Sequence, residues 1–204
     1  MPDGCTMSAP GQSAIGAAVS FLVMWIVMTA AMMLPALVPM LRRYNEAVGG
    51  TSAARLALLT ATVSAGYFAV WTAVGAAAYP LSVVHAAPMV AGGLVVMAGA
   101  FQFTTWKLRH LAGCRAPACG ALAPDARTAW RHGVRLGIHC CCSCAGLTAI
   151  LLVTGVMDLR AMAAVTAAIA AERLTPAGER AARTVGTLAV AAGLVLMGRA
   201  AGVP

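Results

Sequence analysis

Long apolar segments constrain this chain more than any other feature. A helix that crosses a bilayer needs about 20 mostly apolar residues, and the sequence repeats such segments between short polar connections. The segments cover residues 15–41, 53–79, 88–106, 136–157, 159–171 and 184–197. The fifth is near the lower limit for a span, and the alternatives for it are a tilted span, a re-entrant segment or an interfacial helix. We therefore predict an all-α, polytopic membrane helix bundle of six transmembrane helices, a single domain over residues 1–204.

The composition agrees with a lipid environment. Charged residues make up 10% of the chain and hydrophobic residues 61%, whereas a soluble domain carries about 25% charged residues. The net charge of +8 does not indicate nucleic acid, because the basic residues lie in short segments between apolar runs and aromatic side chains for base stacking are sparse. The expected surroundings are the lipid bilayer, with no nucleic acid as partner.

The distribution of basic residues predicts the orientation. Twelve fall in the first, third and fifth connections: Arg42, Arg43, Arg55, Lys107, Arg109, Arg115, Arg127, Arg131, Arg135, Arg173, Arg180 and Arg183. The other side holds only Arg160 and Arg199. By the positive-inside rule this asymmetry requires six spans with both termini outside, and a basic cytoplasmic connection over residues 107–135. The expected location is a bacterial cytoplasmic (inner) membrane.

A cysteine cluster lies in the fourth segment, where His139, Cys140, Cys141, Cys142, Ser143 and Cys144 follow one another. On a helix, Cys140 and Cys144 share a face, and Cys141 and Cys144 are also neighbours. Polar groups at membrane depth are rare and usually functional. The cluster is therefore a candidate metal site, with His139 beside it.

A row of methionines in the first segment supplies further sulfur. Met24, Met28 and Met32 are spaced four apart and Met33 lies beside them. Because the first and fourth segments run in opposite directions, Met32 and Met33 lie at a depth comparable to Cys140. Thiolates and thioethers favour Cu(I), and methionine is a poor zinc ligand, so copper is preferred over zinc. The alternative is that these methionines only fill space in the core.

Two more polar groups are found near the ends of the segments. His110 and Cys114 are four apart in the third connection and share a helix face, so both are candidate ligands. Cys114 and Cys119 do not form a C-x-x-C pair, which argues against a zinc ribbon. Glu172 and Arg173 follow the fifth segment, and we expect them to form an ion pair at the lipid headgroups.

Four motifs resemble those of a bacterial family of uncharacterised integral membrane proteins that are described as predicted metal-binding and often labelled copper-chaperone-like. The motif residues are Trp25, Met28, Ala31, Met32, Met33 and Pro35; Phe101, Gln102, Lys107, Cys114, Arg115 and Pro117; the cysteine cluster with Gly155, Val156, Met157, Asp158 and Leu159; and Glu172, Arg173, Leu174, Pro176 and Gly178. The resemblance covers residues 25–186. Cys140 and Cys144 match the family pattern best, while His110 stands where the family has a cysteine.

The resemblance and the sulfur pattern favour an integral membrane protein that handles Cu(I) as a chaperone, in delivery or in transport, with a metal-receiving protein as its partner. Two alternatives stay open: a membrane thiol-redox protein, and a structural subunit of a larger membrane complex. No hydrolase constellation, P-loop or dinucleotide-binding fingerprint occurs in the sequence, so an enzyme is not predicted.

Overall fold

The computed structural model describes residues 14–82, 88–115, 123–155, 158–175 and 177–202. These residues form seven helices and no strand, which confirms the all-α prediction. The helices are α1 (Ala14–Val48), α2 (Ala53–Ser82), α3 (Pro88–Phe101), α4 (Thr105–Arg115), α5 (Ala126–Thr154), α6 (Leu159–Leu174) and α7 (Gly178–Ala200). Cys5 and Cys119 lie outside the described residues.

Four of these helices, α1, α2, α5 and α7, are long and apolar enough to cross a membrane. The pair α3 and α4 passes the same test only as one bent unit, which raises the number to five. Helix α6, which corresponds to the predicted fifth span, has 16 residues. The described chain thus contains several helices that suit a membrane.

The third predicted segment, residues 88–106, is not one straight helix. Helix α3 ends at Phe101 in a tight turn, where the Gln102, Phe103 and Thr104 amides each donate to the carbonyl three residues earlier. The Thr104 hydroxyl then accepts from the Lys107 amide and caps α4. Helix α4 leaves at 65° to α3. The bend turns α4, with Cys114, away from the direction of α3.

The basic stretch 107–135, predicted as a connection, is mostly helical. Its first part is α4, and its last ten residues are the start of α5. The Asp125 side chain accepts a hydrogen bond from the Thr128 amide and caps α5 there, and this bond holds the pKa of Asp125 below its usual value. The early cap explains why α5 begins before the apolar run predicted from Leu136.

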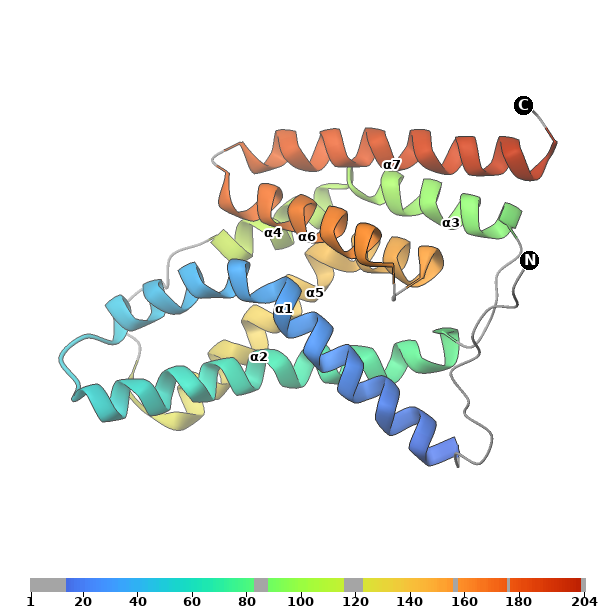
Figure 1. Ribbon diagram of the computed structural model, residues 1–204. Helices are drawn as coiled ribbons and strands as arrows, with labels where there is room; N and C mark the ends of the chain where they lie inside the picture. The colour runs from blue at the N-terminus through green and yellow to red at the C-terminus, as the bar shows by residue number, and fades with distance from the viewer. Residues whose placement is uncertain (1–13, 83–87, 116–122, 156–157, 176, 203–204) are drawn as a thin grey trace.

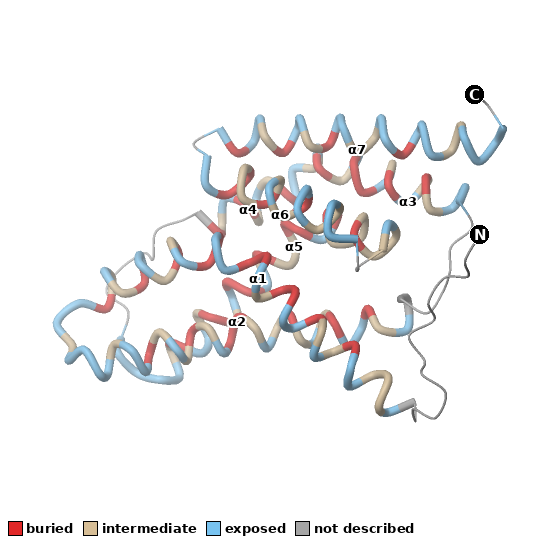
Figure 2. The backbone as a smooth tube through the Cα atoms, viewed as in Figure 1, coloured by how far each residue is buried: buried red, intermediate tan, exposed pale blue. Residues whose placement is uncertain are grey.

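The helices pack along several pairs (Figure 1). Helix α3 lies beside α7, and α2 packs on both α1 and α5, while α6 contacts α1, α5 and α7. Buried positions, red in Figure 2, gather on the sides of the helices that face one another. The core includes Trp25, whose indole N–H donates to the Trp71 carbonyl at 2.9 Å. Apolar and aromatic side chains therefore enclose the centre, where α1, α4, α5 and α6 converge on the cysteines.

Glycines permit the closest helix contacts, because they let two backbones approach one another. A Cβ on Gly193 of α7 would lie 2.8 Å from the Gly92 carbonyl oxygen of α3, and one on Gly133 of α5 would strike the Val63 backbone of α2. Gly99 and Gly186 make a similar contact, but Gly93 faces open space. The α2–α5 contact matters most for the site, because it fixes the helix that carries the cysteine cluster.

Candidate functional site

Three thiols are buried in the same region of the core. Cys140 and Cys144 on α5 and Cys114 on α4 are each at most 2% exposed, whereas Cys141 and Cys142 are half-buried. Cys140 Sγ lies 3.8 Å from Met33 Sδ on α1 and 2.8 Å from the Tyr67 hydroxyl on α2. The structure therefore brings the predicted cysteine face of the fourth segment against a methionine of the first.

Arg173 of α6 reaches into this cysteine cluster. Its Nη2 lies 3.4 Å from Cys144 Sγ and donates to Ser143 Oγ at 2.8 Å and to the Cys140 carbonyl at 3.3 Å. Cys114 also interacts with Arg173 and Ser143. Arg173 is only 8% exposed, so it is buried in the core beside the thiols, whereas we expected it at the end of the fifth segment in an ion pair with Glu172. The buried side of α6 packs against the core, and the guanidinium of Arg173 lies on that side.

Glu172 pairs instead with Lys107 of α4. Lys107 Nζ lies 2.7 Å and 2.8 Å from the two Glu172 carboxylate oxygens, and both side chains are buried. The Gln102 side chain completes the network: its amide N–H₂ donates to Glu172 and its carbonyl accepts from Lys107. Burial of a charged pair is favourable only when its remaining donors and acceptors are satisfied, as here. The network ties α4 to α6 beside the thiols.

Arg173 also retains an unused donor. Its Nη1 is buried and has no hydrogen-bond partner within the described part of the chain. An unsatisfied buried donor of a charged group is costly, so an acceptor brought next to Nη1 would stabilise the guanidinium.

Two histidines form the outer edge of the cysteine cluster. His110 Nδ1 and His139 Nδ1 lie 3.1 Å apart, and both rings are half-buried. The His139 ring packs against Gly113 of α4, where a Cβ would lie 2.8 Å from Nδ1. Gly113 directly precedes Cys114, so this histidine pair adjoins the helix turn that carries a buried thiol.

Two predicted ligands, Met28 and Met32, lie in the same core, but no contact between their sulfur atoms and the thiols is found among the described residues. Met28 and Met32 are buried in the same core, as is Met33. Over the described residues, no group of three or more His, Cys, Asp and Glu side chains is arranged to hold a metal ion.

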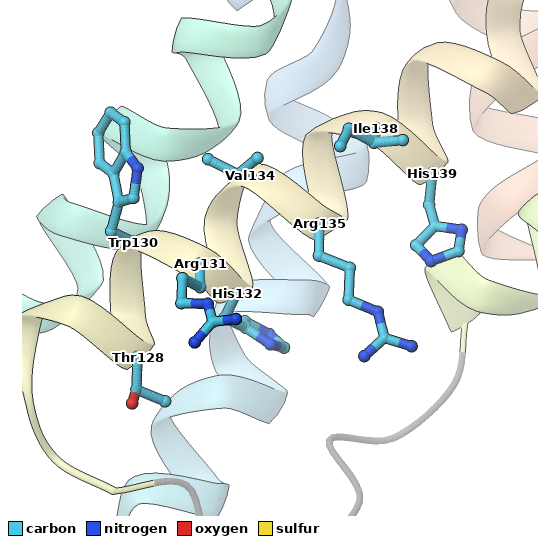
Figure 3. Close-up of a pocket in the computed structure, with 8 residues that line it drawn as sticks. All are labelled: Thr128, Trp130, Arg131, His132, Val134, Arg135, Ile138 and His139. Atoms are coloured by element: carbon cyan, nitrogen blue, oxygen red, sulfur yellow. The ribbon is translucent and has the colours of Figure 1, made fainter.

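An open pocket of about 590 Å³ adjoins the histidine pair (Figure 3). All of its lining residues belong to α5, between Thr128 and His139. Its lining residues are Thr128, Trp130, Arg131, His132, Val134, Arg135, Ile138 and His139. The pocket therefore extends along the exposed surface of α5 and reaches His139.

A model of the PpoB2 family, described as copper chaperone, matches residues 22–196. Because this match covers most of the chain, the protein belongs to this copper chaperone family. The family supports an association with copper, and the long apolar helices are compatible with copper handling at a membrane. No curated protein and no solved structure matches the chain.

Several residues of the site were not predicted from the sequence as site residues. Tyr67 and Ser143 contact the thiols, Lys107 and Arg173 supply positive charge beside them, and Gln102 bridges Lys107 and Glu172. The available signal was that Gln102, Lys107, Glu172 and Arg173 belong to the motifs of the family resemblance. The sequence predicts Lys107 in the cytoplasmic connection and Glu172 and Arg173 at the lipid headgroups, and it assigns no role to Gln102.

Proposed function

We propose that this protein is an integral membrane copper-handling protein that binds Cu(I) through Cys140 and Cys144 and passes it to a receiving protein. The observation that carries the proposal is the buried contact of Cys140 with Met33, beside Cys144 and Arg173. Thiolate and thioether sulfur are soft donors that suit Cu(I). A site of two thiolates and one thioether holds Cu(I) and still allows it to exchange.

The buried charges suit a Cu(I) dithiolate. Lys107 and Arg173 contribute two positive charges and Glu172 one negative charge, all buried. The surplus of one positive charge is offset when Cu(I) is held by two thiolates, because that complex carries one negative charge. A pair of buried charges of opposite sign attract strongly at low dielectric. Arg173 would stabilise the loaded site through Nη1, which has no other partner in the described residues.

The other predicted ligands take secondary roles in this proposal. Cys114, Cys141, Met28 and Met32 provide further sulfur around the pair, and His110 and His139 form an outer site through which the metal passes. Exchange between sites of two or three donors keeps the metal mobile, whereas a closed site of four thiolates is the structural form typical of zinc.

We further propose that the chain forms one transmembrane domain of six spans in a bacterial cytoplasmic membrane, with both termini outside. The charge asymmetry supports this topology, with residues 88–106 as the third span, the basic connection 107–135 in the cytoplasm and α6 as the short fifth span. Cys140 and Cys144 then lie in the cytoplasmic half of the bilayer. A short or bent segment is tolerated where protein rather than lipid surrounds it.

Copper titration of purified protein in lipid nanodiscs tests the function. Under anaerobic conditions, the wild-type protein should compete with a chromogenic Cu(I) chelator, and the C140S/C144S variant should lose this competition. Cys142→Ser is the matched control, because Cys142 is half-buried on the same helix and should leave binding unchanged. Full copper binding by C140S/C144S would overturn the proposal, and a reversible Cys140–Cys144 disulfide without copper binding would favour the thiol-redox alternative.

A further inference from the structure

The pocket on α5 has two chemically different sides. Arg131, His132, Arg135 and His139 are basic, and Figure 3 shows Arg131, His132 and Arg135 projecting to the same side of the helix. Trp130, Val134 and Ile138 are apolar and project to the other side of the helix in Figure 3, where Trp130 and Ile138 are exposed. None of the described lining residues carries a carboxylate. The side that carries the arginines is therefore cationic.

The nearest capping carboxylate does not neutralise this surface. Asp125 accepts the hydrogen bond of the Thr128 amide at the start of α5, at the far end of the pocket from His139. Arg131 and Arg135 are both exposed, and they lie about one and two turns beyond Thr128 along α5. Positive charges in a concave site raise the local concentration of anions and repel cations.

The position of the pocket connects it to the sulfur atoms. One end is His139, which pairs with His110 and packs on the α4 turn that precedes Cys114. Cys140 is the next residue along α5. A metal that leaves a molecule held in the pocket at the His139 end would meet the histidine pair first and the thiols next.

These charges oppose the approach of free Cu(I), which is a cation. We propose that the pocket docks an anionic Cu(I)–thiolate donor, whose carboxylates bind Arg131 and Arg135 while its copper faces His139. The proposal rests on the proposed function and names the form in which the metal arrives. Arginine binds carboxylates in a bidentate manner, and Arg131 and Arg135 lie one turn apart on the side of α5 that leads to His139.

Transfer from the donor is a ligand exchange without a change of oxidation state. Each donor Cu–S bond breaks as a bond from copper to Cys140 or Cys144 forms, and copper remains Cu(I). The proton of each protein thiol passes to the donor thiolate that leaves. The donor therefore departs as free thiol, and its remaining carboxylates release the pocket.

Two thiol donors of opposite charge test the proposal. Cu(I) is supplied as its glutathione complex, which is anionic, or as its cysteamine complex, which is cationic, and protein-bound copper is measured after rapid desalting at timed intervals. The R131Q/R135Q variant should take copper from glutathione about tenfold more slowly than wild type at low salt, with little change for cysteamine. The difference should shrink in high salt, which screens exposed charges.

The matched control is R180Q/R183Q, which removes two exposed arginines of α7 that do not line the pocket. Equal slowing by this control, or no slowing by R131Q/R135Q, would overturn the docking proposal while copper binding itself stands. If wild type accepts copper from neither donor, the proposed function fails instead. If anionic phospholipid in the nanodisc abolishes the difference between wild type and R131Q/R135Q, the pocket holds lipid phosphate and the docking proposal is also overturned.

Discussion

Nη2 of Arg173 lies 3.4 Å from Sγ of Cys144, so a guanidinium from the end of α6 contacts the cysteine cluster of α5. The same nitrogen binds Ser143, and Nη1 has no partner among the described residues. This contact joins two motifs that are about 30 residues apart in the sequence. It gives the cluster a fixed positive charge next to its thiols.

Removal of the guanidinium should weaken copper binding. A hydrogen bond to a charged group contributes roughly 1.5–3 kcal/mol, so Arg173→Met should raise the Cu(I) dissociation constant about ten- to hundredfold. Arg173→Lys should keep part of the affinity because it keeps the charge. Competitive chelator titration measures all three proteins. Arg160→Met, an exposed arginine at the start of the same helix, should have no effect, and unchanged binding by Arg173→Met would contradict this role.

The Lys107–Glu172 pair should behave as a buried ion pair. Glu172→Gln leaves the Lys107 ammonium buried beside Arg173 without its carboxylate, and breaking such a pair costs about 3–5 kcal/mol. Thermal unfolding in detergent, followed by tryptophan fluorescence, should show a clearly lower midpoint for this variant. The double variant K107M/E172M should recover much of the loss, because neither charge is left alone. A double variant that is less stable than Glu172→Gln would contradict this view.

The fold itself was only partly predictable, and the reasons are physical. Long apolar runs predict helices α1, α2, α5 and α7, because a segment in lipid must satisfy its backbone hydrogen bonds within itself, as a helix does. The break after Phe101 was missed, since Gln102 and Thr104 are not strong helix breakers and the turn depends on local hydrogen bonds. Charge at the end of an apolar run does not reveal its depth, so Lys107, Glu172 and Arg173 were assigned to the surface.

The candidate site was predictable to a similar degree. Helical spacing predicts that Cys140 and Cys144 share a face, but only the packed structure brings Met33 and Cys114 to that face. Cys114 reaches it because α4 bends away from α3. Long-range contacts of this kind depend on how the helices cross, which one sequence does not specify.

The α2–α5 contact should be sensitive to a single methyl group. Gly133→Ala places a Cβ against the Val63 backbone, which cannot move as a flexible side chain would, so we expect destabilisation of about 1–3 kcal/mol. Gly93→Ala is the matched control, because a Cβ there meets nothing within 4 Å. Thermal unfolding should separate the two variants clearly. Equal midpoints would show that α2 and α5 do not approach as closely as described.

The six-span topology predicts the location of both termini. Alkaline phosphatase fused after residue 204 should be active, because that enzyme folds only outside the cytoplasm, and green fluorescent protein at the same point should be dark. Fusions within the connection 116–122 should show the opposite pattern. An inactive phosphatase at the C-terminus would place that terminus in the cytoplasm. The number of spans would then be odd if the N-terminus is outside, and α6 would be the helix that most readily fails to cross the membrane.

X-ray absorption spectroscopy of copper-loaded protein identifies the atoms that hold the metal. We expect Cu(I) with a first shell of sulfur from Cys140, Cys144 and Met33, and a Met33→Leu variant that keeps two sulfur ligands and binds copper more weakly. The C140S/C144S protein should give no such spectrum. A first shell of nitrogen and oxygen, or copper retained as Cu(II), would contradict the assignment of this cluster as a Cu(I) site.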